Sequence, residues 1–217
     1  MQIMKQGLVE FFITFFISLF LFYCAIFVID FFISENLKIY AWLAQGLILQ
    51  LIFLVVIYKR YNSNFDLGLE SISAISALKI VMLSIFIAIS LWYVSFHFSV
   101  NQPTQEYKRL AILYELNPYQ IFYVIALAPI LEEVIWRGYA YPCIKKSIGK
   151  FFSIIIISII FALLHVAKRE THIVEFLYSL FFTWLVSSIR DKINTSACII
   201  FHAFYNLTPL TLRLLRG

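Results

Sequence analysis

The sequence predicts an all-α membrane protein, a polytopic bundle of about seven transmembrane helices. The 217 residues are 62% hydrophobic and 13% charged, whereas soluble domains are about 45–50% apolar and about 25% charged. The apolar residues fall into long runs, and a helix needs about 20 of them to cross a bilayer. Most lysines and arginines lie in the connectors between these runs, as is usual in membrane proteins. We therefore expect one integral-membrane domain over residues 1–217.

The first run, at about residues 8–33, exceeds the apolar region of a signal peptide and lacks a small-residue cleavage site, so it is interpreted as a retained anchor. The polar stretches 59–77 and 101–117 read as connectors. Asn117-Pro118 has the pattern of a helix start, with Asn as the cap and Pro in the first turn. The six later runs lie at about residues 39–58, 78–100, 119–144, 151–167, 173–189 and 195–215.

The net charge of +5 does not predict nucleic-acid binding, because the basic residues sit in the connectors. Membrane lipid is the expected partner. The small size and the Ile-, Phe- and Lys-rich composition favour a multi-pass protein of the bacterial cell membrane. The three cysteines are far apart and show no metal-binding spacing, so they read as packing residues.

The fourth run contains charge that an apolar helix would exclude. An ionised side chain at the bilayer centre costs about 2.5–3.5 kcal/mol on insertion scales, so such residues need a reason. Glu133 and Arg137 are four residues apart and can pair on one face. Glu132 points about 100° away and must face something else. Pro129 can kink the helix beside it. A structural ion-pair cluster holding helices together is the alternative interpretation.

Polar residues also interrupt the fifth and seventh runs. His165 follows Phe161 by one turn near the end of an apolar run. His202 and Asn206 are four apart and share a face, so in lipid they must find partners inside the bundle. Taken singly, these residues could simply make interfacial or interhelical hydrogen bonds. Counted from the connectors at 1.5 Å per residue, however, they lie at depths similar to that of Glu132. We therefore predict a site between helices 4, 5 and 7.

Three motifs occur in order on these runs: Glu132-Glu133-x-x-x-Arg137, Phe161-x-x-x-His165 and His202-x-x-x-Asn206. In this order they resemble the motifs of the CAAX-protease and bacteriocin-processing family, which comprises intramembrane peptidases of the type II CAAX prenyl endopeptidase kind. The resemblance covers about residues 127–207, within the predicted core helices 119–210.

The resemblance implies an endopeptidase that cuts a membrane-associated peptide or a lipidated protein. Glu132 would be the general base that activates water, and His165 would help to orient that water. His202 and Asn206 would stabilise the oxyanion, while Glu133, Arg137 and Phe161 would support the site. Amide hydrolysis needs a base, a positioned water and donors aimed at the oxyanion, so the residue types agree with these roles. No cofactor is required by this scheme.

Three alternatives remain open from the sequence. Glu132, His165 and His202 are legitimate zinc ligands, so a metal-dependent peptidase is possible, although the HExxH spacing is absent. Cys198 is four residues from His202 and could form a thiolate–imidazole pair. A non-catalytic immunity or regulatory protein could use the same helices to bind a peptide or a partner membrane protein. The substrate itself is not readable: a CAAX-like protein, a bacteriocin and a signalling-peptide precursor all remain candidates.

Overall fold

The computed structural model describes residues 66–98, 118–166 and 173–214, together with individual positions between residues 9 and 55. Within these parts the chain is helical apart from short connections, and no strand occurs among them. The all-α prediction is confirmed to that extent. Most of the first two predicted runs, and the connector 101–117, lie outside the described residues, so the number of seven helices stays a prediction.

Each predicted run from the third to the seventh corresponds to a helix. The fourth run is a continuous helix over Pro118–Ile148. The predicted cap, Asn117, lies outside the described residues. Two of its segments, η1 and η2, are π-helical, with a wider turn than the α-helix. The elements are α3 (Ala74–Phe98), α5 (Pro118–Phe122), η1 (Tyr123–Leu127), α6 (Ala128–Glu133), η2 (Val134–Ala140), α7 (Tyr141–Ile148), α8 (Lys150–Val166), α9 (Ile173–Lys192) and α10 (Thr195–Leu214).

Helix α3 begins four residues earlier than the apolar run predicted. The hydroxyl of Ser73 accepts a hydrogen bond from the Ser76 amide at 3.2 Å, and the Ser73 carbonyl accepts one from Ala77 at 2.9 Å. Ser73 therefore caps the helix. The serine-rich sequence around it had been interpreted as connector, because serine favours both caps and loops.

Among the described residues, two helices are long and apolar enough to cross a membrane, Ala74–Val94 and Pro118–Ile148, and Lys150–His165 is a shorter apolar helix. Along α3, Leu78, Met82 and Phe86 expose more than 60% of their surface at four-residue spacing. An apolar stripe of this kind is stable against lipid rather than against water. Together with the composition, it indicates a membrane location.

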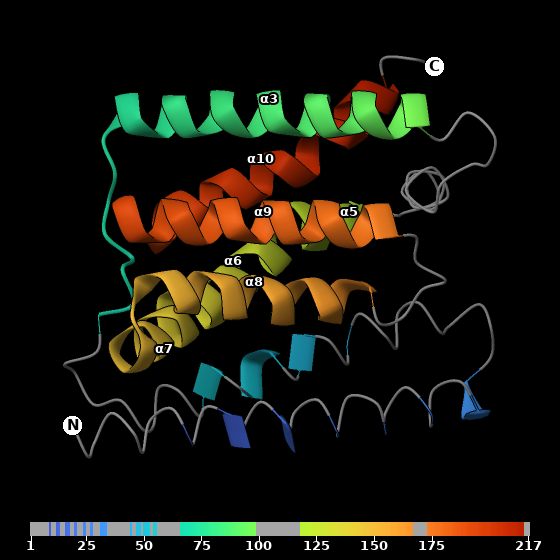
Figure 1. Ribbon diagram of the computed structural model, residues 1–217. Helices are drawn as coiled ribbons and strands as arrows, with labels where there is room; N and C mark the ends of the chain where they lie inside the picture. Colours follow the sequence, from blue (N-terminus) through green and yellow to red (C-terminus); the bar gives the residue numbers. More distant parts are fainter. Residues whose placement is uncertain are drawn as a thin grey trace.

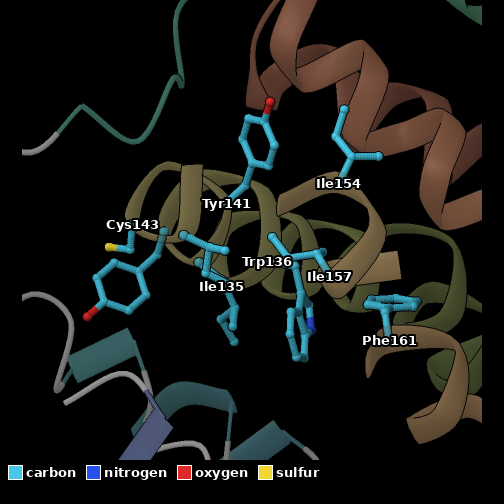
Figure 2. Close-up of a cluster of buried hydrophobic side chains, with 10 residues drawn as sticks. Ile135, Trp136, Tyr141, Cys143, Ile154, Ile157 and Phe161 are labelled. Carbon is cyan, nitrogen blue, oxygen red and sulfur yellow. The ribbon is translucent and has the colours of Figure 1, made fainter. Parts of the chain in front are cut away.

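The helices pack as a bundle in which α8 lies along α9, and α10 crosses between α3 and the long helix (Figure 1). Ser84, fully buried on α3, donates a hydrogen bond to the carbonyl of Phe201 on α10 at 2.8 Å. A second contact area joins η2 and α7 to α8 (Figure 2), where Ile135, Trp136 and Tyr141 pack with Ile157 and Phe161. This packing fixes the two helices that carry the glutamates and His165.

A non-helical segment, residues 66–72, lies across one end of the bundle, and we refer to it as the strap. The Thr195 amide donates to the carbonyl of Gly68 at 2.8 Å, and the Thr195 hydroxyl donates to that of Leu67 at 2.6 Å. Asn194 donates its side-chain amide to the carbonyl of Glu70 at 3.2 Å. The start of α10 is thus tied to the segment that precedes α3.

The same end of the bundle has a polar clip centred on Asp191, near the end of α9. Its carboxylate accepts hydrogen bonds from Tyr141 at 2.7 Å and from Lys145, and it forms an ion pair with Lys150. Partial burial opposes ionisation of Asp191, but the hydrogen bonds from Lys145, Lys150 and Tyr141 outweigh it and hold the pKa of the carboxyl well below its usual range. The clip joins α7, α8 and α9.

Candidate active site

Glu133 is fully buried at the end of α6 and is held by two cationic or donor groups. Arg137 Nη1 lies 3.2 Å from Glu133 Oε1, as the four-residue spacing predicted, and both side chains have no solvent exposure. His202 Nδ1 from α10 lies 2.8 Å from the same oxygen. Arg137 Nη2 also donates to the Thr183 carbonyl of α9 at 3.3 Å. Glu133 is therefore the point at which the long helix, α9 and α10 meet.

Glu132, the next residue, faces His165 on α8. Glu132 Oε2 lies 3.9 Å from His165 Nε2, and the two side chains keep 19% and 33% of their exposure, respectively. This carboxylate is therefore the wetter of the two. The other ring nitrogen, His165 Nδ1, lies 2.9 Å from the Phe161 carbonyl. Because a carbonyl only accepts, Nδ1 carries the proton, and the Nε2 of a neutral His165 presents its lone pair toward Glu132.

Phe161 explains the four-residue spacing that precedes His165. Its ring stacks on the imidazole with centroids 4.2 Å apart and an interplanar angle of 17°. The Arg137 guanidinium carbon lies 4.7 Å from the centre of the same ring. Trp136 packs edge-on against it at 5.7 Å. One buried aromatic residue thus links the arginine behind Glu133 with the histidine that faces Glu132.

The predicted residues therefore form two pairs rather than one group. Glu132 is paired with His165, and Glu133 is paired with His202 as well as with Arg137. The two pairs are joined because the glutamates are consecutive. If Glu133 is the ionised partner of Arg137, its oxygen can only accept, so His202 Nδ1 carries the proton. The lone pair of a neutral His202 is then on Nε2, as in His165.

Asn206 is placed one turn beyond His202, but its bond runs to main chain. Its Nδ2 donates to the carbonyl of Val124 in η1 at 2.9 Å. The Ala128 amide bonds to the Tyr123 carbonyl, a five-residue step, so the next bond in that register would run from residue 129 to Val124. Residue 129 is proline and has no N–H. Asn206 replaces the missing donor, and its second amide hydrogen stays available.

Neither the zinc set nor the cysteine pair left open by the sequence is assembled. Among the described residues, no group of three or more His, Cys, Asp or Glu side chains gathers as a metal site would require. The Cys198 thiol is fully buried and donates to the carbonyls of Val186 and Asn194 at 3.3 and 3.4 Å, while His202 Nδ1 is engaged by Glu133.

Comparison with known families decides the type of protein. Residues 114–208 match the family described as type II CAAX prenyl endopeptidase Rce1-like. This stretch, somewhat less than half of the chain, is similar to that family. The Rce1-like region contains all three motifs and confirms the resemblance found in the sequence. It indicates a peptidase embedded in a membrane. No curated protein and no solved structure matches the chain.

Several residues that hold the Rce1-like site were not found by sequence reasoning. Arg190 of α9 was counted only as a connector charge, yet its Nε donates to the Arg137 carbonyl at 2.9 Å. Thr183, a fully buried residue of α9, contributes the carbonyl that receives Arg137 Nη2. These contacts use backbone atoms, which any residue type offers. A sequence shows the arginine of each contact but not the carbonyl that it binds, which lies on another helix.

Proposed function

We propose that this protein is a metal-free intramembrane endopeptidase in which Glu132 activates a water molecule for attack on a peptide bond. The observation that carries the proposal is the facing arrangement of Glu132 Oε2 and His165 Nε2 at 3.9 Å, in the more exposed half of an otherwise buried polar centre. Both atoms present lone pairs, so both accept hydrogen bonds.

A single water can satisfy the two acceptors together. With hydrogen bonds of about 2.8 Å to each atom, a 3.9 Å separation corresponds to an angle of about 90° at the water oxygen, close to the angle between its own two hydrogens. The water's lone pairs then point away from both side chains, toward a substrate carbonyl. Glu132 takes the proton as attack proceeds and can later give it to the leaving amine.

His202 and Asn206 are the proposed donors to the oxyanion of the tetrahedral intermediate. Asn206 keeps one amide hydrogen beyond its bond to Val124. His202 donates from Nε2 when both of its nitrogens carry protons, and its Nδ1 lies 2.8 Å from Glu133 Oε1. With Glu132 and Glu133 ionised and Arg137 and His202 cationic, the charges of the site sum to zero. Preorganised donors of this kind typically contribute about 10²–10³ in kcat each.

The substrate class is a membrane-associated peptide or lipidated protein. The family description supports a CAAX-like substrate, and a bacteriocin or signalling-peptide precursor is the alternative within the same chemistry. The expected partners are membrane lipid and that substrate. The alternative function is to bind a peptide or membrane protein without cleaving it. The test below distinguishes this binding from hydrolysis.

The test is cleavage by the purified full chain in lipid vesicles. The probes are a peptide ending in a prenylated CAAX sequence and its unprenylated counterpart. We expect Glu132→Gln to lower kcat by about 10²–10⁴-fold with little change in KM, because it removes the base and keeps the shape. Glu70→Gln, an exposed glutamate of the strap, is the matched control with wild-type turnover.

Two results would reject the mechanism. Undiminished cleavage by Glu132→Gln would show that Glu132 is not the general base. Loss of cleavage on chelation, with recovery on addition of zinc, would show that the enzyme needs a metal. An effect in cells that survives Glu132→Gln at normal protein levels would instead support the non-catalytic function.

A further inference from the structure

Pro142 leaves a main-chain carbonyl of the site without its helical partner. At the end of η2 the Tyr141 amide bonds to the Trp136 carbonyl, a five-residue step. In that register the next donor, residue 142, would bond to the carbonyl of Arg137. Because residue 142 is proline, this donor does not exist. A buried carbonyl without a partner costs free energy comparable to a lost hydrogen bond, so a substitute donor is needed.

Arg190 is that substitute. Its Nε donates to the Arg137 carbonyl at 2.9 Å, across 53 residues of sequence. The same arrangement occurs one π-segment earlier, where Asn206 bonds to the Val124 carbonyl that Pro129 leaves open. Two prolines, each following a five-residue step, are thus each matched by one side chain from another helix. Because the same arrangement occurs twice, we interpret each side-chain donor as a replacement for the N–H that the proline lacks.

The strap holds Arg190 in place. Gly68 has a φ of +64°, and a Cβ at that position would lie 2.6 Å from the Arg190 guanidinium carbon. The guanidinium therefore packs directly on a glycine backbone, and a Cβ at this position would push it aside. Gly138, next to Arg137, is covered by the strap as well, with the Leu67 carbonyl 3.2 Å from a Cβ built there.

We propose that Arg190 is a positioning residue of the peptidase site, which fixes the turn carrying Arg137 and Glu133 by supplying the hydrogen bond that Pro142 cannot. Arg137 is bound at both ends: Arg190 holds its carbonyl, while its guanidinium holds Glu133, which in turn contacts His202. Displacing the Arg137 backbone therefore shifts Glu133 and the imidazole together. This inference rests on the proposed function, and it places Arg190 outside contact with substrate.

The test restores the missing donor. Arg190→Met keeps much of the side-chain volume and removes the N–H; we expect kcat to fall about tenfold with KM changed less than about twofold. Adding Pro142→Ala returns a backbone N–H to the position that faces the Arg137 carbonyl, and should recover most of the lost kcat. Adding Pro129→Ala instead, which returns a donor to the wrong carbonyl, should recover none.

The melting temperature of the same full-chain variants in vesicles gives a second measurement. Arg190→Met and Pro142→Ala should be coupled in a double-mutant cycle, and Arg190→Met and Pro129→Ala should not be. If the two substitutions are coupled in melting temperature but not in kcat, Arg190 has only a structural role and the proposal is overturned. The proposal is also overturned if Pro142→Ala and Pro129→Ala restore kcat equally, or if neither restores it. If the wild type cuts no probe, the stability cycle still decides whether Arg190 replaces the donor that Pro142 lacks at the Arg137 carbonyl, so failure of the proposed function is seen separately.

Discussion

Phe161 contacts two residues of the candidate site with one side chain. Its ring contacts the His165 imidazole and the Arg137 guanidinium, and its carbonyl fixes the tautomer of His165. A substitution at this position removes the ring but keeps the backbone carbonyl. It can therefore separate the effect of ring stacking from the effect of the hydrogen bond to His165.

We predict that Phe161→Leu lowers kcat several-fold and leaves the tautomer of His165 unchanged. Loss of a stacked pair and a cation–π contact is worth roughly 1–2 kcal/mol in total. Steady-state cleavage gives the rate, and nitrogen chemical shifts of labelled histidine report the tautomer. Phe152→Leu, at an exposed phenylalanine of the same helix, is the control. An unchanged kcat would show that the stack has no part in positioning His165.

The buried Glu133–Arg137 pair makes a sharper prediction at the same scale. Arg137→Met leaves a fully buried carboxylate whose Oε2 already lacks a partner among the described residues. Breaking a buried pair from one side costs about 3–5 kcal/mol. Adding Glu133→Gln should return a large part of that loss, because an amide is cheaper to bury than a carboxylate that has lost its arginine. Denaturant unfolding of the two single variants and the double variant measures the free energy of unfolding. If the two single losses simply add in the double variant, the pairing is contradicted.

At the scale of the elements, the strap and α9 depend on one glycine. Gly68→Ala introduces a side chain at positive φ and also collides with Arg190, whereas Gly149→Ala, at φ +82°, meets open space. We expect each substitution to destabilise the folded protein by roughly 1–3 kcal/mol, because alanine is strained at positive φ. Only Gly68→Ala should also lower kcat, because only it displaces Arg190. Melting temperature and turnover of the two variants separate the effects, and equal turnover in both would contradict this coupling.

The long helix shows which elements the sequence could predict. The Glu133–Arg137 pair depends on neighbours within one turn, so local pattern was sufficient to predict it. The π-helical segments were not predicted, because five-residue steps leave no distinct apolar period. The bond between His202 and Glu133 spans 69 residues. Depth counting placed the two side chains near each other, yet it could not say which glutamate each histidine would face.

At the scale of the whole molecule, the Asp191 clip makes stability depend on pH. The folded pKa of Asp191 lies below its unfolded value of about 3.9, so the clip's contribution is complete above that pH and is lost as the pH falls through the folded value. We predict that Asp191→Asn is less stable than the wild type at pH 7 and that the gap narrows below about pH 4. Melting temperatures across pH 3–7 measure this, and a constant gap would contradict it.

The membrane location follows from features distributed over the whole chain, whereas the count of spans does not. Composition and the exposed stripe on α3 indicate lipid, and two of the described helices are long and apolar enough to cross it. Residues 101–117 and most of residues 1–65 lie outside the described structure, so the bundle of seven and the extent of its core remain predictions from apolar runs.

Residues 66–72 bond to residues 194–196, so two stretches about 128 positions apart must meet before the site is complete. A ribosome delivers a chain from its N-terminus. The strap, α3 and both glutamates thus leave the exit tunnel before His202, Asn206 and Thr195 exist. The insertion machinery must release these early helices into lipid while Glu133 is paired with Arg137 alone, and its contact with His202 can form only when the last helix arrives.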